Sequence, residues 1–594
     1  MMFYDNKCYK ELADRLCVKY ALRDSQVKAM LSSEDAKACL DYCNRMKTAM
    51  KDRLKPVTEV EGEIKLVSSK IINFFRVENV IFQGKNGECI PINVYSPLDD
   101  SKKYPAVVVS VGHWREGKRL EVNQRLCQHL CAEGMVVAIY DPMYQGERNP
   151  YTDQMLERMF PGVSEDIQMV NLHMQSGNAC YLLGDNLGEF FLWDSMRVVD
   201  YLLTRNDVDP ERIAATGQSG GGTQSVYLAA CDDRVTCYSP IQSITKERLT
   251  ITGSGIGDCE QSMMGISEDD GFDYPDMLWG AYPAQCMINA ARKDFFGIEG
   301  VYEVNDELAT LYNLLGKNRF HTRYSNGEHW LDEEARNIEC DFLCNALLGR
   351  DSEKDESDFV LLSEDELKCF TDCETRVSQK FALRNRLDNI KLLRPKDDSK
   401  ARSELIKLIE KSRESRGNCE THFATRDSNK LIVVLTGRSL WDKFSNTVDD
   451  TLFVMPMGAE EGIEKQRNKI AGYDVVTGIF NEAVVLGEGY ASSIAAQVID
   501  AVEKAESERK HSHITLVAEG AMTTAALLVG AVTRINKTVL IDPIQSLESL
   551  FTDEMHNISE AAMEPGLMKI ADIPELKKLN MSVEYTTVQN SILV

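Results

Sequence analysis

The sequence lacks an excess of positive charge. Its 67 lysine and arginine residues are outnumbered by 93 aspartate and glutamate residues, which leaves a formal net charge of −26. A surface of that sign repels phosphate backbones and anionic membranes. We therefore expect neither nucleic acid nor a membrane among the partners of this protein.

Long apolar runs are also scarce. The longest ones, such as residues 106–111 and 135–140, have the length of strands and are too short to cross a bilayer. The opening MMFYDNKCYKELADRL has no basic segment followed by an apolar one, so it does not resemble a secretory signal. These two observations predict a cytoplasmic protein.

The cysteines form no dense cluster. There are 17 of them, an odd number, spread from Cys8 to Cys419. Zinc sites favour two-residue gaps or histidines nearby in sequence, whereas i,i+4 spacing places two thiols on one helical face. We expect packed helical thiols in a reducing compartment and predict no metal site. The pairs with i,i+4 spacing are Cys39/Cys43, Cys127/Cys131, Cys340/Cys344 and Cys369/Cys373.

The chain is long enough for more than one domain, because 594 residues exceed the usual size of about 150 per domain. We predict a helical lead-in over residues 1–76 and an α/β unit over 77–349. A charged, partly helical connector over 350–429 precedes a second, smaller α/β unit over 430–594. Alternating strands and helices predict a mostly parallel sheet with helices on both faces.

The first sheet is predicted to open with a hairpin. An alternating, β-branched segment starts near Val77, and a Gly-Lys-Asn-Gly turn at 84–87 divides it into two strands. The elements expected after it are strands at 106–111, 136–140 and 212–216, and helices at 122–133 and 187–203.

The segment GQSGG at residues 217–221 carries the strongest chemical signal. It follows a predicted strand and precedes a predicted helix, as the nucleophile elbow of a hydrolase does. Small residues on both sides of Ser219 suit this turn, because the backbone passes close to its neighbours there. We predict Ser219 as the nucleophile, with a structural glycine turn as the alternative.

A serine nucleophile needs a base, and the chain has only nine histidines. In the order Ser, then Asp or Glu, then His, the base lies downstream in the first unit, which leaves His321 and His329. His321 falls inside a probable strand, whereas His329 lies in the loop that follows it. We therefore predict His329 as the general base.

The third member of the triad must be a carboxylate that orients the imidazole. Asp294 comes directly after the probable strand 285–291 and is the predicted acid. Glu299 is a nearby rival, and the structural alternative for Asp294 is a cap or a pair with Arg292 or Lys293. Three further aspartates precede that strand and are less suited, namely Asp258, Asp273 and Asp276.

The oxyanion hole should combine two backbone amides. One is the amide of Gly220, directly after the nucleophile, and the other belongs to the loop after an early strand. The strand that ends near Val111 leads into Gly112-His113-Trp114, so the backbone of His113 or Trp114 is the second candidate. The side chains of these two residues are expected to line the pocket.

Taken together, these motifs resemble the acetyl xylan esterase and dienelactone hydrolase-like branch of the α/β hydrolases, over roughly residues 77–348. The resemblance implies an α/β-hydrolase fold, with Ser219 as nucleophile, Asp294 as acid and His329 as base. The segments that carry it are GHWREGK (112–118), DPMYQGE (141–147), WDSMRVVDYL (193–202), VDPERIAATGQSGGG (208–222), DCEQ (258–261) and KDFFGIEG (293–300).

The second unit repeats part of the first. YSPIQSI at 238–244 is echoed by IDPIQSL at 541–547, each after a strand, a tight turn and an Ala-rich helix. The position of the nucleophile is occupied by Gly520, which has no side chain for attack. We interpret residues 430–594 as a degenerate hydrolase copy, with an unrelated Rossmann-like unit as the alternative.

The sequence thus predicts a serine esterase that cleaves a small-molecule carboxylic ester, acetyl or another acyl ester, through an acyl-enzyme and without a cofactor. A peptidase or amidase on the same triad is the nearest alternative. A non-enzymatic binding or scaffold protein is the alternative from another class. The second unit is expected to mediate homo-oligomerisation or to cover the active site.

Overall fold

The computed structural model describes residues 6–58, 62–84, 89–254, 260–269, 271–370, 372–413, 419–435, 440–456, 474–552 and 558–586. Their contacts divide the chain into two compact units. The large unit comprises residues 17–174 and 186–382, and the small unit comprises residues 1–16, 175–185 and 383–594.

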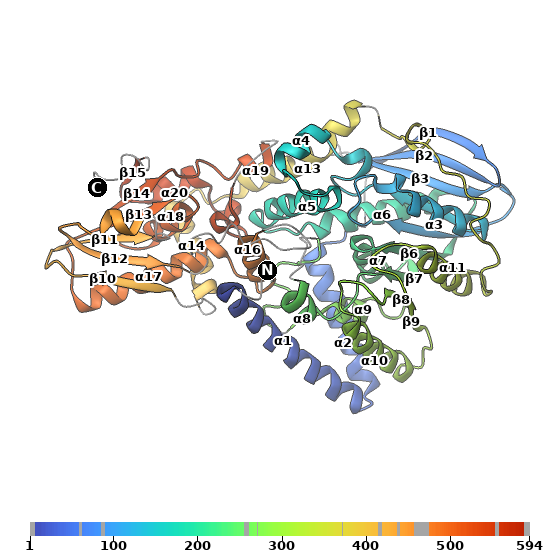
Figure 1. Ribbon diagram of the computed structural model, residues 1–594, viewed down its shortest axis with the longest axis horizontal. Helices are drawn as coiled ribbons and strands as arrows, with labels where there is room; N and C mark the ends of the chain where they lie inside the picture. The colour runs from blue at the N-terminus through green and yellow to red at the C-terminus, as the bar shows by residue number, and fades with distance from the viewer. Residues whose placement is uncertain are drawn as a thin grey trace. The chain divides into compact units, whose positions relative to one another are not determined.

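The large unit contains a nine-stranded sheet in the order β1-β2-β3-β5-β4-β6-β7-β8-β9 (Figure 1). The first three strands and the β3–β5 pair are antiparallel, and the strands from β5 to β9 are parallel. The predicted α/β-hydrolase fold is confirmed. The strands are β1 (Gly62–Ile72), β2 (Phe75–Gly84), β3 (Cys89–Pro97), β4 (Tyr104–Ser110), β5 (Val136–Tyr140), β6 (Val208–Gln218), β7 (Val235–Ile241), β8 (Gln285–Ala291) and β9 (Phe320–Ser325).

The central strands are buried on both faces, and an apolar core lies on each side of the sheet. In β4, Ala106 and Val108 pack into one core, while Val107 and Val109 pack into the other, as the alternation of side chains along a strand requires. The helices lying wholly in the large unit are α2 (Ala36–Leu54), α3 (Glu121–Ala132), α4 (Asp153–Met159), α6 (Gly188–Thr204), α7 (Gly220–Cys231), α8 (Glu247–Leu249), α9 (Tyr274–Ala281), α10 (Ile298–Leu314), α11 (Glu333–Leu348) and α12 (Glu364–Leu367).

The first sheet begins earlier than the sequence predicts. Strand β1 starts at Gly62, inside the predicted lead-in of residues 1–76, and pairs with β2 along its length. Its residues are mostly exposed on both faces, so no buried apolar face marks it as part of the sheet. Most of the predicted hairpin turn at 84–87 lies outside the described residues.

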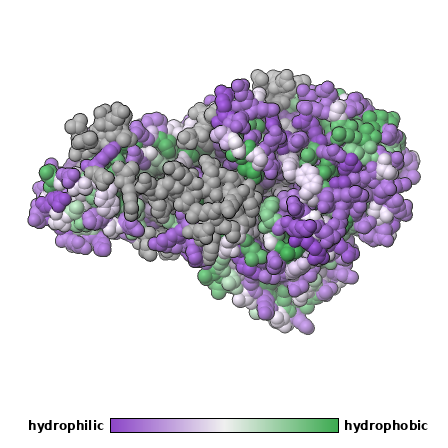
Figure 2. Space-filling view, in the orientation of Figure 1, coloured by the Kyte–Doolittle hydropathy of each residue, from purple (hydrophilic) through white to green (hydrophobic). Residues whose placement is uncertain are grey.

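Apolar side chains remain exposed along this edge of the sheet. Ile64, Leu66 and Ile71 of β1 have exposed fractions of 42, 56 and 65%. In Figure 2, green apolar residues gather over the edge where β1 and β2 lie, on a face that is otherwise mainly hydrophilic.

Part of the predicted connector packs into the large unit. The side chains of Leu362 and Leu367 are buried in the core beside α3, although the surrounding sequence is highly charged. Two glutamines of α3 hold this segment by its backbone, because Gln124 bonds to both the amide and the carbonyl of Leu362 and Gln128 does the same at Val360. The connector of residues 350–429 also contains α12, the helices α13 (Asp372–Leu393) and α14 (Asp398–Arg413), and strand β10.

The small unit contains a six-stranded sheet in the order β10-β12-β11-β13-β14-β15. Strand β10 is antiparallel to β12, and all other pairs are parallel. This is the order and direction of β3-β5-β4-β6-β7-β8 in the large unit. The strands are β10 (Glu420–Ala424), β11 (Lys430–Leu435), β12 (Asp450–Met455), β13 (His513–Glu519), β14 (Lys537–Ile541) and β15 (Val583–Thr586).

Most helices of the small unit lie in its C-terminal part. They are α15 (Trp441–Phe444), α16 (Val475–Val485), α17 (Tyr490–Glu508), α18 (Met522–Val532), α19 (Ser549–Thr552) and α20 (Ile573–Leu579), preceded by α14. Three further helices have residues in both units, namely α1 (Lys7–Ser32), α5 (Glu165–Leu182) and α13.

The described cysteines are unbridged, and all but Cys17 and Cys419 are buried. Burial raises the pKa of the Cys43 thiol to about 12, which keeps it protonated. Within the described ranges, no helix combines the length and the apolar composition needed to cross a bilayer.

A buried carboxyl group is hydrogen-bonded to side chains of three neighbouring strands of the large sheet, β6, β7 and β8. Glu339 of α11 accepts hydrogen bonds from the hydroxyls of Thr216 (2.8 Å) and Ser239 (2.7 Å), and from the amide of Asn289 (3.4 Å). Burial raises the pKa of Glu339 to about 7, although these hydrogen bonds lower it.

Because this pKa is higher in the folded chain than the ordinary value of 4.5 for a glutamate, the group stabilises the fold most when it is protonated. Its contribution is full below about pH 4.5 and is lost as the pH rises towards 7. We predict that Glu339→Gln removes this loss, so the variant gains up to about 3 kcal/mol relative to the native chain between pH 5 and pH 8. Urea unfolding of the native chain and of Glu339→Gln at pH 5 and pH 8 gives the free energy of unfolding of each protein. If both proteins lose the same free energy of unfolding between the two pH values, the prediction is contradicted.

Candidate active site

Ser219 lies at the sharp turn between β6, which ends at Gln218, and α7, which begins at Gly220. Its backbone has a φ of 58°, a left-handed conformation that costs a non-glycine residue about 1–3 kcal/mol. The turn is held by hydrogen bonds at both ends: the Ser219 amide donates to the Ile241 carbonyl (2.8 Å), and the Ser219 carbonyl accepts from Gly222 (2.8 Å). The hydroxyl is thereby fixed at the carboxyl end of the sheet.

The glycine positions around Ser219 leave no room for a larger side chain. A Cβ atom at Gly217 would lie 2.3 Å from the carbonyl oxygen of Ser110, and one at Gly221 would lie 2.2 Å from the same atom. At Gly112 it would lie 3.2 Å from the Cβ of Ser219. Strand β4 and the elbow therefore approach each other more closely than any side chain permits.

The three residues of the predicted triad lie in one hydrogen-bonded chain. His329 Nε2 is 2.9 Å from Ser219 Oγ, and His329 Nδ1 is 3.0 Å from both carboxylate oxygens of Asp294. Asp294 follows β8 and is nearly buried, while His329 follows β9 and is partly exposed. The rings of Phe295 and Phe296 pack against the imidazole, with centroids 4.3 and 5.6 Å away.

The rival residues lie in other settings. His321 is on β9, and burial lowers its pKa. Glu299 is in the first turn of α10. Asp273 and Asp276 form the capping box of α9, and Asp258 lies outside the described residues.

A chain of polar side chains connects the loops around the triad. Trp114 Nε1 donates to Gln218 Oε1 (3.2 Å), Gln218 Nε2 donates to Gln242 Oε1 (3.0 Å), and Gln242 Nε2 donates to the Trp330 carbonyl (2.8 Å). The rings of Trp114 and Trp330 also meet edge to face at 4.8 Å. Neither Gln242 nor Trp330 was given a role from the sequence, because their contacts join segments that lie far apart along the chain.

Hydrogen bonds hold the predicted oxyanion loop. The Trp114 amide donates to the Gly112 carbonyl within the loop (2.8 Å), so of the two predicted donors the backbone of His113 is the better candidate beside Gly220. The side-chain amide of Gln145 donates to the carbonyls of both Gly112 and Trp114. Gln145 belongs to the DPMYQGE segment, so this motif supports the loop.

Charged residues of the two loop motifs, GHWREGK and DPMYQGE, meet in one buried network. Asp141 accepts from the backbone amides of Lys118 (2.7 Å) and Glu147 (2.9 Å), and the Lys118 ammonium contacts both carboxylates. Gly117 and Gly146 have positive φ angles and press against Asp141, where a Cβ would collide with its carboxylate. Sequence inspection identified both motifs but not that Asp141, in the second motif, binds the backbone of Lys118 in the first.

A second polar cluster lies against the elbow. The side chains of His113, His173 and Glu260 converge, and a Cβ at Gly220 would lie 3.1 Å from His113 Cε1 and 3.2 Å from Glu260 Oε1. Burial alone would raise the pKa of Glu260, but the charge of His113 and hydrogen bonds from both histidines hold that pKa well below its ordinary value. His173 was not predicted from the sequence.

The small unit has an elbow of the same backbone geometry at Gly520. Gly520 has a φ of 56°, its amide donates to the Ile541 carbonyl (2.9 Å), and its carbonyl accepts from Thr523 (3.2 Å). The residue that follows the next strand also matches. Asp542 after β14 in the small unit has a φ of 45°, and Gln242 after β7 in the large unit has a φ of 51°. No side chain occupies the nucleophile position.

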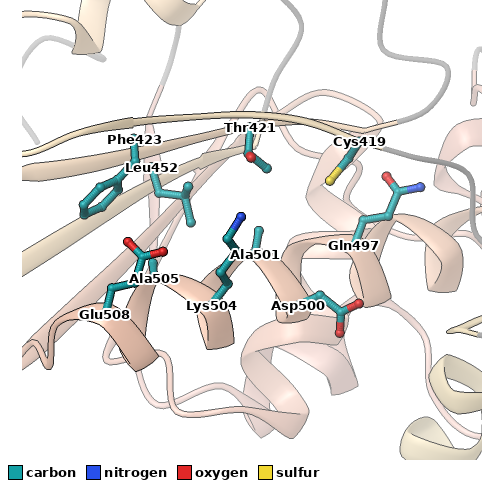
Figure 3. A pocket seen from close by; sticks show the side chains of 10 residues that line it. All are labelled: Cys419, Thr421, Phe423, Leu452, Gln497, Asp500, Ala501, Lys504, Ala505 and Glu508. Carbon is teal, nitrogen blue, oxygen red and sulfur yellow. The ribbon is translucent and has the colours of Figure 1, made fainter.

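A cavity of about 430 Å³ lies elsewhere in the small unit, between residues of β10 and β12 and the helix α17 (Figure 3). Its lining contains no histidine or serine and so offers no Ser–His pair. The lining residues are Cys419, Thr421, Phe423, Leu452, Gln497, Asp500, Ala501, Lys504, Ala505 and Glu508.

Comparison with known proteins agrees with the motifs. Residues 49–243 match the acetyl xylan esterase (AXE1) family, which confirms the resemblance. The matched segment includes Ser219 and ends before Asp294 and His329. Over 54 residues the chain is 39% identical to the putative hydrolase YtaP of Bacillus subtilis (strain 168), which is 9% of this chain and 18% of that protein. The chain thus spans less than a fifth of the length of this relative.

The solved structures that the chain matches at low identity include esterases. Methylesterase BT1017 is 19% identical, with 61% of this chain and 75% of that chain covered and a TM-score of 0.45. Acetyl xylan esterase 1 from Thermoanaerobacterium sp. JW/SL YS485 is 17% identical, with 52% and 92% covered and a TM-score of 0.34.

We predict that Gly221→Ala destabilises the large unit by about 3 kcal/mol or more, because the new methyl group meets a backbone oxygen that cannot move aside. The control is Gly297→Ala, whose Cβ would have only ordinary contacts at 3.5 and 3.6 Å. It should cost less than about 1 kcal/mol. Chemical unfolding followed by circular dichroism compares the two, and equal losses would show that the close approach to Ser110 is not the cause.

Proposed function

We propose that the large unit is a carboxylic ester hydrolase that uses Ser219, His329 and Asp294 as its catalytic residues. The observation that carries the proposal is the continuous hydrogen-bonded chain from the Ser219 hydroxyl through both imidazole nitrogens to the Asp294 carboxylate. The match to acetyl xylan esterases over residues 49–243 supports an ester as the substrate.

Each residue has a distinct role in the proposed reaction. His329 Nε2 accepts the hydroxyl proton while Ser219 Oγ attacks the carbonyl carbon of the ester, and Asp294 holds the Nδ1–H and stabilises the charged imidazole. The amides of Gly220 and His113 donate to the negatively charged oxygen, aided by the N-terminus of α7. The alcohol leaves with the proton from His329. Water then takes the place of the alcohol: His329 accepts a proton from the water as its oxygen attacks the acyl carbon, and Ser219 Oγ leaves with that proton to release the acid.

The surroundings of the triad suit this chemistry, since electrostatic catalysis depends on groups already oriented before the substrate arrives. Gln145 holds the oxyanion loop by two carbonyls. The chain from Trp114 through Gln218 and Gln242 to Trp330 connects that loop to the elbow and to the loop of His329.

We further propose that the small unit is a degenerate copy of the hydrolase fold, without a nucleophile. Its support is the shared strand order and the shared elbow geometry, with Gly520 at the position of Ser219. An unrelated Rossmann-like unit is not expected to reproduce the second positive φ angle, at Asp542.

We predict that Ser219→Ala lowers kcat for short-chain p-nitrophenyl esters by at least about a thousandfold, because the covalent step loses its nucleophile. The matched control is Ser225→Ala in the same helix; among the described residues its hydroxyl donates to the Gly222 carbonyl alone, so it should be dispensable for activity. Esterase activity retained by Ser219→Ala would contradict the assignment. Amide substrates hydrolysed faster than esters would point to a peptidase or amidase.

We predict that a fluorophosphonate probe labels the chain once, at Ser219, and that the small unit takes up none. Labelling is measured by intact mass and located by peptide mapping on the native chain and on Ser219→Ala. A single adduct that disappears in the variant is the expected result. An adduct on the small unit would contradict the proposal that this unit lacks a nucleophile, and no adduct on the native chain would favour a non-enzymatic binding protein.

A further inference from the structure

We propose that His113, His173 and Glu260 form a binding site for one divalent transition-metal ion, of the Zn²⁺ or Co²⁺ type, directly behind the nucleophile elbow. The site differs from the triad in its residues and goes beyond the proposed esterase function. It also departs from our sequence-based prediction of no metal. Sequence spacing could not reveal it, because His113 and His173 lie 60 positions apart and Glu260 lies further along the chain.

The three side chains present their ligand atoms to one point. His113 Nε2 is 3.1 Å from His173 Nδ1, His173 Nδ1 is 3.7 Å from Glu260 Oε1, and His113 Nε2 contacts the same carboxylate oxygen. Ligands of a tetrahedral zinc ion at the usual bond lengths lie about 3.3 Å apart. Two of the three separations are close to this value, and the His113–Glu260 contact has to open by a small side-chain movement.

The tautomer of His173 is suited to metal binding. Its Nε2 lies 2.7 Å from the Met143 carbonyl, which can only accept, so Nε2 carries the proton and Nδ1 presents a lone pair to the cluster. A backbone carbonyl that fixes the second nitrogen is the usual partner of a metal-ligating histidine. The Phe191 ring packs against His173 at 5.2 Å and screens this side from solvent.

Glu260 is held in place, and one of its carboxylate oxygens is available to bind a metal ion. It is 1% exposed, and its main-chain carbonyl accepts a hydrogen bond from the Tyr227 hydroxyl (2.6 Å). Its Oε2 atom is buried and has no hydrogen-bond partner among the described residues. An orphaned carboxylate oxygen is costly in a protein interior, and a metal ion held by both oxygens of this carboxylate removes that cost.

The donor set indicates the class of metal and its role. Two imidazole nitrogens and one carboxylate favour zinc, cobalt or nickel over magnesium or calcium, which prefer oxygen ligands alone. Three protein ligands leave positions open for water or a substrate oxygen. Since Glu260 Oε1 and the His113 ring lie close to Gly220, the ion would add positive charge beside the predicted oxyanion amide.

The test uses the full chain with Ser219→Ala, so that binding is measured without ester hydrolysis and does not depend on the proposed function. The protein is stripped with a chelator and titrated with Co²⁺, with bound metal measured by equilibrium dialysis and the site followed by visible absorption. We expect one tightly bound ion that is displaced by Zn²⁺ and is lost when Glu260→Gln or His173→Gln is added.

His321→Gln is the matched control, because this histidine of β9 belongs to neither the cluster nor the triad and the variant should keep the full stoichiometry. Circular dichroism checks that each variant is folded, and either cluster variant suffices for the comparison. No tight ion on the stripped chain, or the same number of ions with and without Glu260→Gln, would overturn the proposal and leave the cluster as a buried ion pair.

Discussion

The backbone conformation of Ser219 is the constraint on which the rest of the large unit depends. A φ of 58° is unfavourable for serine, and the turn persists because the Ile241 carbonyl and the amides of Gly222 and Thr223 hold it at both ends. The absence of side chains at Gly217 and Gly221 allows β4 to approach the turn. This approach brings Gly112 and the oxyanion loop against the nucleophile, and the hydrogen bonds of Gln145 and Gln218 fix the loop in that position.

The same constraint accounts for the buried charges nearby. Loops that must hold one conformation close to a reacting atom cannot rely on apolar packing alone, since their backbone groups need partners. Asp141 provides these partners for the backbone of the two loop motifs, and Lys118 neutralises its charge. Glu260 and the two histidines fill the space behind Gly220 in a similar way, with one carboxylate oxygen still unused.

The parallel part of the sheet and the candidate site could be predicted from the sequence because each rests on local patterns. Strands β4 and β5 are continuous apolar runs, and the GQSGG turn between a strand and a helix has a geometric reason for every glycine. Strand β1 was not predicted, because its residues, apolar ones included, are exposed on both faces and its place in the sheet depends on pairing with β2. The burial of Leu362 depends on amide pairs with Gln124, which no local pattern reveals. Likewise, the chain of glutamine and tryptophan residues and the His113–His173–Glu260 cluster arise from contacts between distant segments.

The central claim is that Ser219 forms a covalent acyl-enzyme. The most direct measurement is mass spectrometry of the chain quenched during turnover of a p-nitrophenyl ester, followed by peptide mapping. The account predicts one acyl group per chain, carried by the peptide that contains Ser219. Continued ester hydrolysis with the acyl group on another residue would contradict it.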